Sequence, residues 1–138
     1  MSAVVASARG WLGTPYHHQA SLKGKGCDCL GLLRGVWREV MGDEPEPMPP
    51  YSPDWDEAQG REDMLRVCNA HLVPVEVIGP GTVLVFRMRP GMVAKHCGIA
   101  SGEGTLIHSH TGHGVHEVAL TDWWLRRVAG RFNFPEVR

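Results

Sequence analysis

Residues 23–40 read KGKGCDCLGLLRGVWREV, a glycine- and lysine-rich loop that leads directly into an amphipathic stretch. Apolar side chains then recur at the spacing of one helix face until Gly42, so the pattern predicts a helix over 29–41 with Asp28 as its N-cap. Cys29 lies in the first turn of that helix, where the partial positive charge of the N-terminus favours the thiolate. The sequence therefore indicates a reactive cysteine at the start of a helix.

Composition limits the classes of function. The chain has 138 residues, 43% of them hydrophobic, which suits one domain over 1–138 with a substantial core. A formal net charge of −1, from 14 basic and 15 acidic residues, leaves no basic field to hold nucleic acid. No stretch approaches the roughly 20 apolar residues of a membrane span, and residues 1–6 lack the features of a secretory signal. We therefore expect synthesis in the cytoplasm, no membrane insertion and no nucleic-acid partner.

The four cysteines are expected to be reduced thiols. They stand at positions 27, 29, 68 and 97 and form no Cys-x-x-Cys pair, and a disulfide framework does not suit a chain with this much apolar content. Cys27 is the competing candidate for the nucleophile, but it precedes the predicted cap and so lies in the loop. No cofactor is expected.

Helical patterns occupy the first half of the chain and strand patterns the second. Helices are predicted over 2–12, 29–41 and 54–71, with a polar loop over 17–27 and an extended proline-rich connection over 43–53. Strands are predicted over 82–86, 93–100, 105–110, 115–120 and 131–134, with a short helix over 121–127 in which Trp123 and Trp124 are core anchors. Helices followed by an antiparallel meander define an α+β domain.

Two histidines on neighbouring strands complete the candidate site. Alternation along 93–100 puts Cys97 on the core face and His96, between very small residues, on the other. A hairpin can bring His108 beside His96, since cross-strand neighbours lie about 5 Å apart. We expect the Cys29 thiolate to attack a carbonyl carbon, with His96 as its base and His108 orienting His96.

The role of orienting His96 is also open to other histidines. His110 shares the strand face of His108, and His113 and His116 follow closely, while predicted strand registers are uncertain by a few residues.

Four separate stretches of the chain resemble the NlpC-type cell-wall cysteine peptidases. They are WLGTPY (11–16), GCDCLGL (26–32), KHCGIA (95–100) and LIH (106–108). The resemblance covers most of the chain and implies a minimal papain-like fold, in which N-terminal helices pack on an antiparallel sheet. It also implies hydrolysis of the peptide stems of bacterial peptidoglycan, typically at a bond between D-glutamate and a diamino acid, with no metal.

Carried over to this sequence, the resemblance places the nucleophile at Cys29, the base at His96 and the polar third residue at His108. It places Tyr16 near the site, and we expect Tyr16, Asp28 and Leu30 to bind substrate. Leu30 is a departure, because the family usually has serine there, and we expect it to reshape the floor of the pocket. A second departure is the Gly81-Thr82 pair, where the family often has Gly-Asp.

The same resemblance suggests how the protein reaches its substrate. The lack of a signal peptide and of wall-binding repeats is similar to phage-tail or phage-like-particle members, so we expect action on periplasmic or cell-wall peptidoglycan together with such particle proteins. Two alternatives belong to other classes. One is a catalytically idle structural tail component, and the other is a Cys/His metal-binding module whose ligands would suit zinc. Amidase or acyl-transfer chemistry also remains open, because the triad fixes acyl chemistry and not the acyl group.

Overall fold

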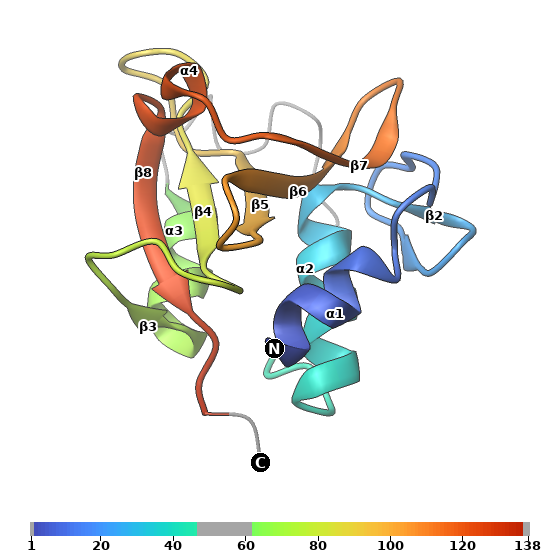
Figure 1. Ribbon diagram of the computed structural model, residues 1–138. Coiled ribbons are helices and arrows are strands. Elements are labelled where there is room, and N and C mark those ends of the chain that lie inside the picture. The colour runs from blue at the N-terminus through green and yellow to red at the C-terminus, as the bar shows by residue number, and fades with distance from the viewer. Residues whose placement is uncertain (1, 47–61, 137–138) are drawn as a thin grey trace.

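The computed structural model describes residues 2–46 and 62–136, where the chain forms helices and antiparallel strands (Figure 1). The helices are α1 (Ala3–Arg9), α2 (Cys29–Val40), α3 (Asp63–His71) and α4 (Asp122–Leu125). The strands are β1 (Ser21–Leu22), β2 (Gly26–Cys27), β3 (Val73–Pro74), β4 (Val83–Phe86), β5 (His96–Ala100), β6 (Thr105–His110), β7 (Gly114–Ala119) and β8 (Val128–Asn133). No helix in these two ranges is long and apolar enough to cross a membrane.

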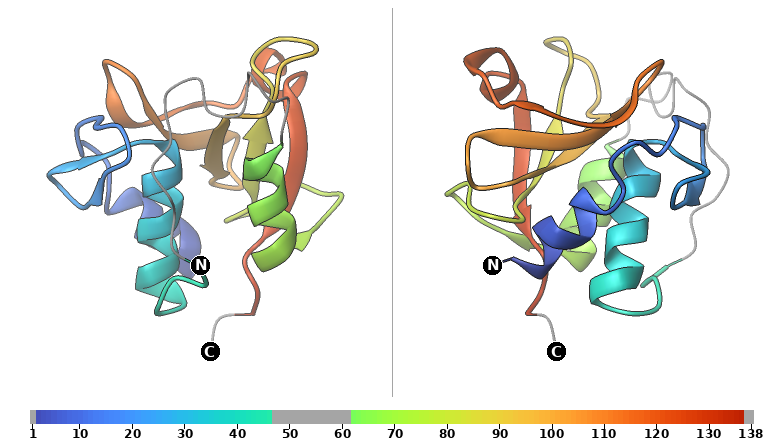
Figure 2. Two further views of the ribbon diagram at one scale, coloured as in Figure 1. Left: turned by 180° about the vertical axis from the view of Figure 1, so that it is seen from behind. Right: turned by 45° about the vertical axis from the view of Figure 1, so that its right-hand side comes forward.

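The main sheet has the strand order β3-β8-β4-β5-β6-β7, and every neighbouring pair is antiparallel. Strands β4 to β7 form a meander, and β8 returns to the free side of β4. Helices α1 and α2 pack together beside β5 and β6, and α3 lies beside β8 (Figures 1 and 2). The arrangement confirms the predicted α+β class, with N-terminal helices packed on an antiparallel meander.

Alternation along the strands buries both faces of the central sheet. On the helix-covered face, Cys97, Ile99 and Ile107 join the main core with apolar residues of α1, α2 and α3. On the other face, a smaller cluster contains Phe86 and Leu106, and the partly buried Trp124 packs against it. The start of β5 therefore lies between two apolar clusters, which fixes the position of the residues there.

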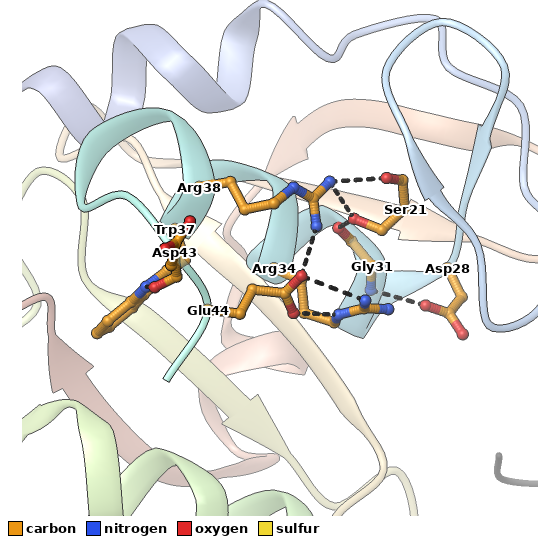
Figure 3. Close-up of polar contacts among 8 residues, drawn as sticks. All are labelled: Ser21, Asp28, Gly31, Arg34, Trp37, Arg38, Asp43 and Glu44. Atoms are coloured by element: carbon orange, nitrogen blue, oxygen red, sulfur yellow. Dashed lines mark hydrogen bonds and ion pairs between the residues drawn. The ribbon is translucent and has the colours of Figure 1, made fainter. Parts of the chain in front are cut away.

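A polar network holds the first turn of α2 against the small β1–β2 hairpin (Figure 3). The Ser21 hydroxyl donates to the carbonyl oxygen of Gly31 at 2.6 Å, and the Arg38 guanidinium donates to both oxygens of Ser21 at 2.7 and 2.9 Å. Arg34 and Arg38 also pair with the Glu44 carboxylate, at 2.6 and 2.9 Å. The network joins the loop before α2 and the segment after it to the same helix face.

Several elements differ from the sequence-based expectation. The β1–β2 hairpin lies within the predicted loop 17–27, because two-residue strands give no alternation pattern. Strand β5 begins at His96 rather than at position 93, and β8 begins at Val128 rather than at 131. Helix α3 begins at Asp63, and the predicted start at 54 and most of the proline-rich connection lie outside the described residues.

The prediction that Trp123 is a core anchor is wrong. Its side chain is 44% exposed, and the guanidinium carbon of Arg127 lies 3.8 Å from the ring centroid. A helix as short as α4 has too few turns for its sequence to indicate which tryptophan faces inward.

Gly31 lies where α2 packs closely against the loop before β1. A Cβ atom here would overlap the backbone oxygen of Ala20 and lie 3.0 Å from the Asp28 carboxylate. We expect Gly31→Ala to lower the free energy of unfolding by about 2 kcal/mol, because the overlap outweighs a helix-propensity gain of up to about 1 kcal/mol. Urea unfolding measures the change, and Gly79→Ala, where a Cβ meets nothing within 4 Å, is the control. Equal stability of the two variants would contradict this packing.

Candidate active site

Cys29 is the first residue of α2, and Asp28 caps the helix as predicted. The Asp28 carboxylate accepts the backbone N–H groups of Gly31 and Gln19, each at 2.7 Å. The Cys29 thiol donates to the carbonyl oxygen of Lys95, the residue just before β5, at 3.6 Å. The cap thus fixes the reactive sulfur at the junction of helix and sheet.

The pKa of Cys29 lies well below its ordinary value. The largest cause is a hydrogen bond from the thiol of Cys97, and the His96 ring lowers the pKa further by hydrogen bonding and by its charge. Burial and the negative charge of Asp28 oppose these effects. The neighbouring groups therefore favour the thiolate, which is the nucleophilic form of cysteine.

His96 and His108 lie together, as the alternation and the hairpin predicted. Nε2 of His96 is 2.8 Å from Nδ1 of His108, and the two rings are nearly perpendicular, at 86°. Because Nε2 of His96 contacts His108, Nδ1 is the ring nitrogen of His96 that is left to interact with Cys29.

His108 is suited to orient a protonated His96. Burial, followed by the charge of His96 and the other nearby imidazoles, lowers the pKa of His108 to about 3. Its ring is therefore neutral in the physiological range, and Nδ1 can accept a hydrogen bond from an imidazolium Nε2–H of His96. This arrangement would hold the ring of His96 while it carries the proton of the thiol.

Tyr16 also lies near the cysteine. Burial raises the pKa of its phenol, a hydrogen bond with Thr111 lowers it, and the charges of Asp28 and Cys29 raise it further. Its backbone forms a parallel bridge with Cys27, which holds the residue beside the start of α2. Sequence reasoning placed Tyr16 here through the family resemblance and did not find Thr111, which lies beyond the end of β6.

Asp28 and Leu30 have packing roles in the structure. Asp28 is buried, and its contacts to Gly31 and Gln19 are those of a helix cap. Leu30 is 3% exposed and belongs to the main core, where it lines an apolar pocket between α2 and α3. Their assignment to substrate binding stays a prediction.

Cys27, the competing nucleophile, is fully buried. Burial raises the pKa of its thiol to about 11, a hydrogen bond with Ser109 opposes the shift, and the Ser109 hydroxyl also donates to its carbonyl oxygen at 2.7 Å. The pKa of Cys68 is likewise raised to about 12 by burial. The pKa of the Cys97 thiol is also raised, by its hydrogen bond with Cys29 and by burial. These three thiols are therefore protonated at neutral pH, which leaves Cys29 as the reactive one.

Two neighbours of the catalytic candidates were not found from the sequence. Trp124 of α4 stacks on His96 with ring centroids 5.9 Å apart, and its edge-to-face contact with His108 is 5.0 Å. Cys97 was predicted to face the core, which it does, but its contact with Cys29 depends on how α2 docks on the sheet. The Cys97 thiol also lies 3.4 Å from the carbonyl oxygen of Cys29.

The histidine-rich strands do not form a metal centre in the part of the chain that the structure describes. No three His, Cys, Asp or Glu side chains there converge in a way that could hold a metal ion. The described side chains thus give no support to the zinc-module alternative.

A cysteine at a helix N-terminus, facing histidines of an antiparallel sheet, defines a papain-like domain. The NlpC/P60 family matches residues 13–131, and the chain belongs to this family. The chain is 27% identical, over 135 residues, to gamma-DL-glutamyl hydrolase of Bacillus subtilis, but spans only 29% of the length of that relative and 97% of its own.

Solved structures show the same fold. The NlpC/p60 domain of peptidoglycan hydrolase SagA matches with a TM-score of 0.67 and 22% identity, covering 96% of this chain and 97% of that domain. An NlpC/P60 family protein from Bacillus cereus matches with a TM-score of 0.68 and 21% identity, over 97% of this chain and 40% of the other. NlpC2 from Trichomonas vaginalis matches with a TM-score of 0.68 and 19% identity, over 95% and 44% of the two chains.

Removal of the Cys97 thiol should raise the pKa of Cys29. We expect Cys97→Ala to react about threefold to tenfold more slowly with iodoacetamide below neutral pH, because a hydrogen bond to the thiolate is lost. Mass spectrometry of Cys29 labelling over a pH series measures the shift, and Cys68→Ala controls for loss of another buried thiol. A Cys97→Ala profile that matches wild type would contradict the role of this hydrogen bond.

The low pKa of His108 predicts a loss of stability in acid. Below pH 6.5 the unfolded chain binds a proton on this histidine, whereas the folded chain does not until about pH 3, so stability falls as the pH decreases through this window. Urea unfolding over the window should show a smaller acid loss for His108→Gln than for wild type. His17→Gln, which removes an exposed histidine, is the control. The same acid loss in His108→Gln and wild type would show that His108 is not the responsible group.

Proposed function

We propose that this chain is a cysteine peptidase that hydrolyses the peptide stems of bacterial peptidoglycan, at the bond between D-glutamate and a diamino acid. The observation that carries the proposal is the Cys29 thiol, with its lowered pKa, beside a His96 ring that is bonded to His108 at 2.8 Å. Membership of the NlpC/P60 family supports the substrate class. The similarity to a gamma-DL-glutamyl hydrolase supports a bond made by a glutamyl residue.

The first half of the reaction forms an acyl-enzyme. The Cys29 thiolate attacks the carbonyl carbon, and the carbonyl electrons move to oxygen as the carbon–sulfur bond forms. At the start of α2, the N–H groups of Gly31 and Leu32 are already bonded to Asp28, so the backbone N–H groups of Cys29 and Leu30 are the candidates for binding this oxyanion. As the carbonyl re-forms, the carbon–nitrogen bond breaks, and the imidazolium of His96 donates its proton to the departing amine.

The second half regenerates the enzyme. Water attacks the thioester carbon while neutral His96 accepts one of its protons. The carbon–sulfur bond then breaks to release the Cys29 thiolate and a carboxylic acid, which loses its proton to solvent. His108 keeps His96 in one orientation through both halves. Trp124 stacks on the same ring and excludes water from one of its faces.

Delivery with a phage tail or phage-like particle, and action in the periplasm or cell wall, belong to the proposal and rest on the sequence resemblance alone. The lowered pKa of Cys29 and the 2.8 Å contact between His96 and His108 argue against the competing function, a structural tail component without activity.

Mass spectrometry of fragments released from purified peptidoglycan tests this function. We expect wild type to generate new ends between D-glutamate and the diamino acid, and Cys29→Ala to lose activity on the order of 10⁴-fold or more, because the nucleophile is absent. Cys27→Ala is the matched control and should retain activity, since that thiol is buried and protonated. Activity that survives in Cys29→Ala would refute the peptidase mechanism, and fragments cut elsewhere would refute the assigned bond.

A further inference from the structure

A row of imidazole rings continues outward from the catalytic candidates. His108 and His110 lie on β6, His116 is opposite His108 on β7, and His113 lies in the turn between the strands. The rings of His108 and His110 are stacked with centroids 5.7 Å apart, those of His110 and His113 are parallel at 5.3 Å, and those of His113 and His116 are 5.8 Å apart. The four histidines, together with Val118 and Trp124, line a pocket of about 330 Å³, which we call the imidazole pocket.

The titratable groups that act on His108 and His110 are all imidazoles. Burial lowers the pKa of His110, and the nearby imidazoles of His96, His113 and His116 lower it further. Glu117 of β7, on the other face of that strand, has its carboxylate bonded to Arg9 and Thr105. From α4 the contacting side chain is the uncharged Trp124.

Arg127, which follows α4, makes its contacts outside the pocket lining. The Arg127 guanidinium lies over the Trp123 ring and donates to the backbone oxygens of Trp123 and Met88. Within the described chain, protonation of His108 and His110 is opposed by burial and by other imidazoles, and no carboxylate is among the groups that shift their pKa values. An anion bound among these imidazoles would favour their protonated forms.

The lining of the pocket indicates which anion fits. Three exposed histidines offer ring N–H donors, while Val118 and Trp124 provide an apolar wall for the carbon atoms that carry the anionic group. A cation is disfavoured, because no three potential ligands in the described ranges converge on one point. His108 belongs both to the pocket and to the pair with His96, and the ring centroids of His96 and His110 are 6.4 Å apart. A group bound in the pocket would therefore lie near the proposed base, on the side of His108 away from it.

We propose that the imidazole pocket is a subsite for a carboxylate of the peptide substrate next to the scissile bond, held by the ring N–H groups of His110, His113 and His116. The inference rests on the proposed peptidase function. Because protonated imidazoles bind a carboxylate more strongly than neutral ones, preference for an acidic substrate increases as the pH falls.

The test compares two synthetic stem peptides that differ at one group, a free carboxylate beside the scissile bond or the corresponding carboxamide. For wild type we expect the ratio of kcat/KM values, carboxylate over carboxamide, to be roughly tenfold near pH 5.5 and to fall toward about twofold near pH 8. The double variant His113→Gln/His116→Gln should bring the ratio close to one at both pH values. His71→Gln, which removes a histidine on α3, should keep the ratio of wild type.

Binding measurements separate this inference from the peptidase function. Calorimetric titration of Cys29→Ala with the two peptides should show tighter binding of the carboxylate form in mild acid, and this preference should disappear when the two pocket substitutions are added. A pH-dependent binding preference without cleavage would refute the proposed function and support the subsite. Cleavage of both peptides at equal rates at both pH values, with no binding preference, would overturn the subsite and leave the proposed function intact.

Discussion

The carboxylate of Asp28 is the contact on which the geometry of the site depends. Its two hydrogen bonds, to the backbone N–H groups of Gly31 and Gln19, start α2 at Cys29 and hold the preceding loop against the helix. A buried carboxylate that accepts two backbone donors stabilises a helix start strongly, but its negative charge also disfavours a thiolate on the next residue. The reactive sulfur therefore needs compensation from the sheet, and Cys97 and His96 of β5 provide it. The helix cap thus positions the sulfur of Cys29, and the sheet residues lower its pKa.

The part of the site that lies on the sheet depends on close packing of β5 against β6. A Cβ on Gly98 would lie 2.7 Å from a methyl carbon of Leu106 and 3.0 Å from Cβ of His108, so a side chain at position 98 would require Leu106 and β6 to shift. The close packing of the two strands brings the ring of His108 to its 2.8 Å contact with His96. Trp124 then closes the outer side, because it touches both rings and Phe86.

How much the sequence predicts depends on whether a feature is local. The cap at Asp28 and the position of Cys29 follow from a few neighbouring residues, and the pairing of His96 with His108 follows from alternation and a short hairpin. The contact of Cys97 with Cys29 depends on the docking of α2 against β5, and the contact of Trp124 depends on the path of the chain after β7. Neither leaves a pattern in the sequence, and for the same reason the four-residue helix α4 gave the wrong prediction for Trp123.

The most direct test of the account is the pKa of the Cys29 thiol in the folded protein, measured from thiolate ultraviolet absorbance during a pH titration of wild type and Cys29→Ala. The account predicts an absorbance step in wild type well below the ordinary thiol pKa of about 8.5, absent from Cys29→Ala and moved to higher pH in His96→Gln. A Cys29 step at or above pH of about 8.5, or one that does not respond to loss of His96, would contradict the thiolate–imidazolium pair.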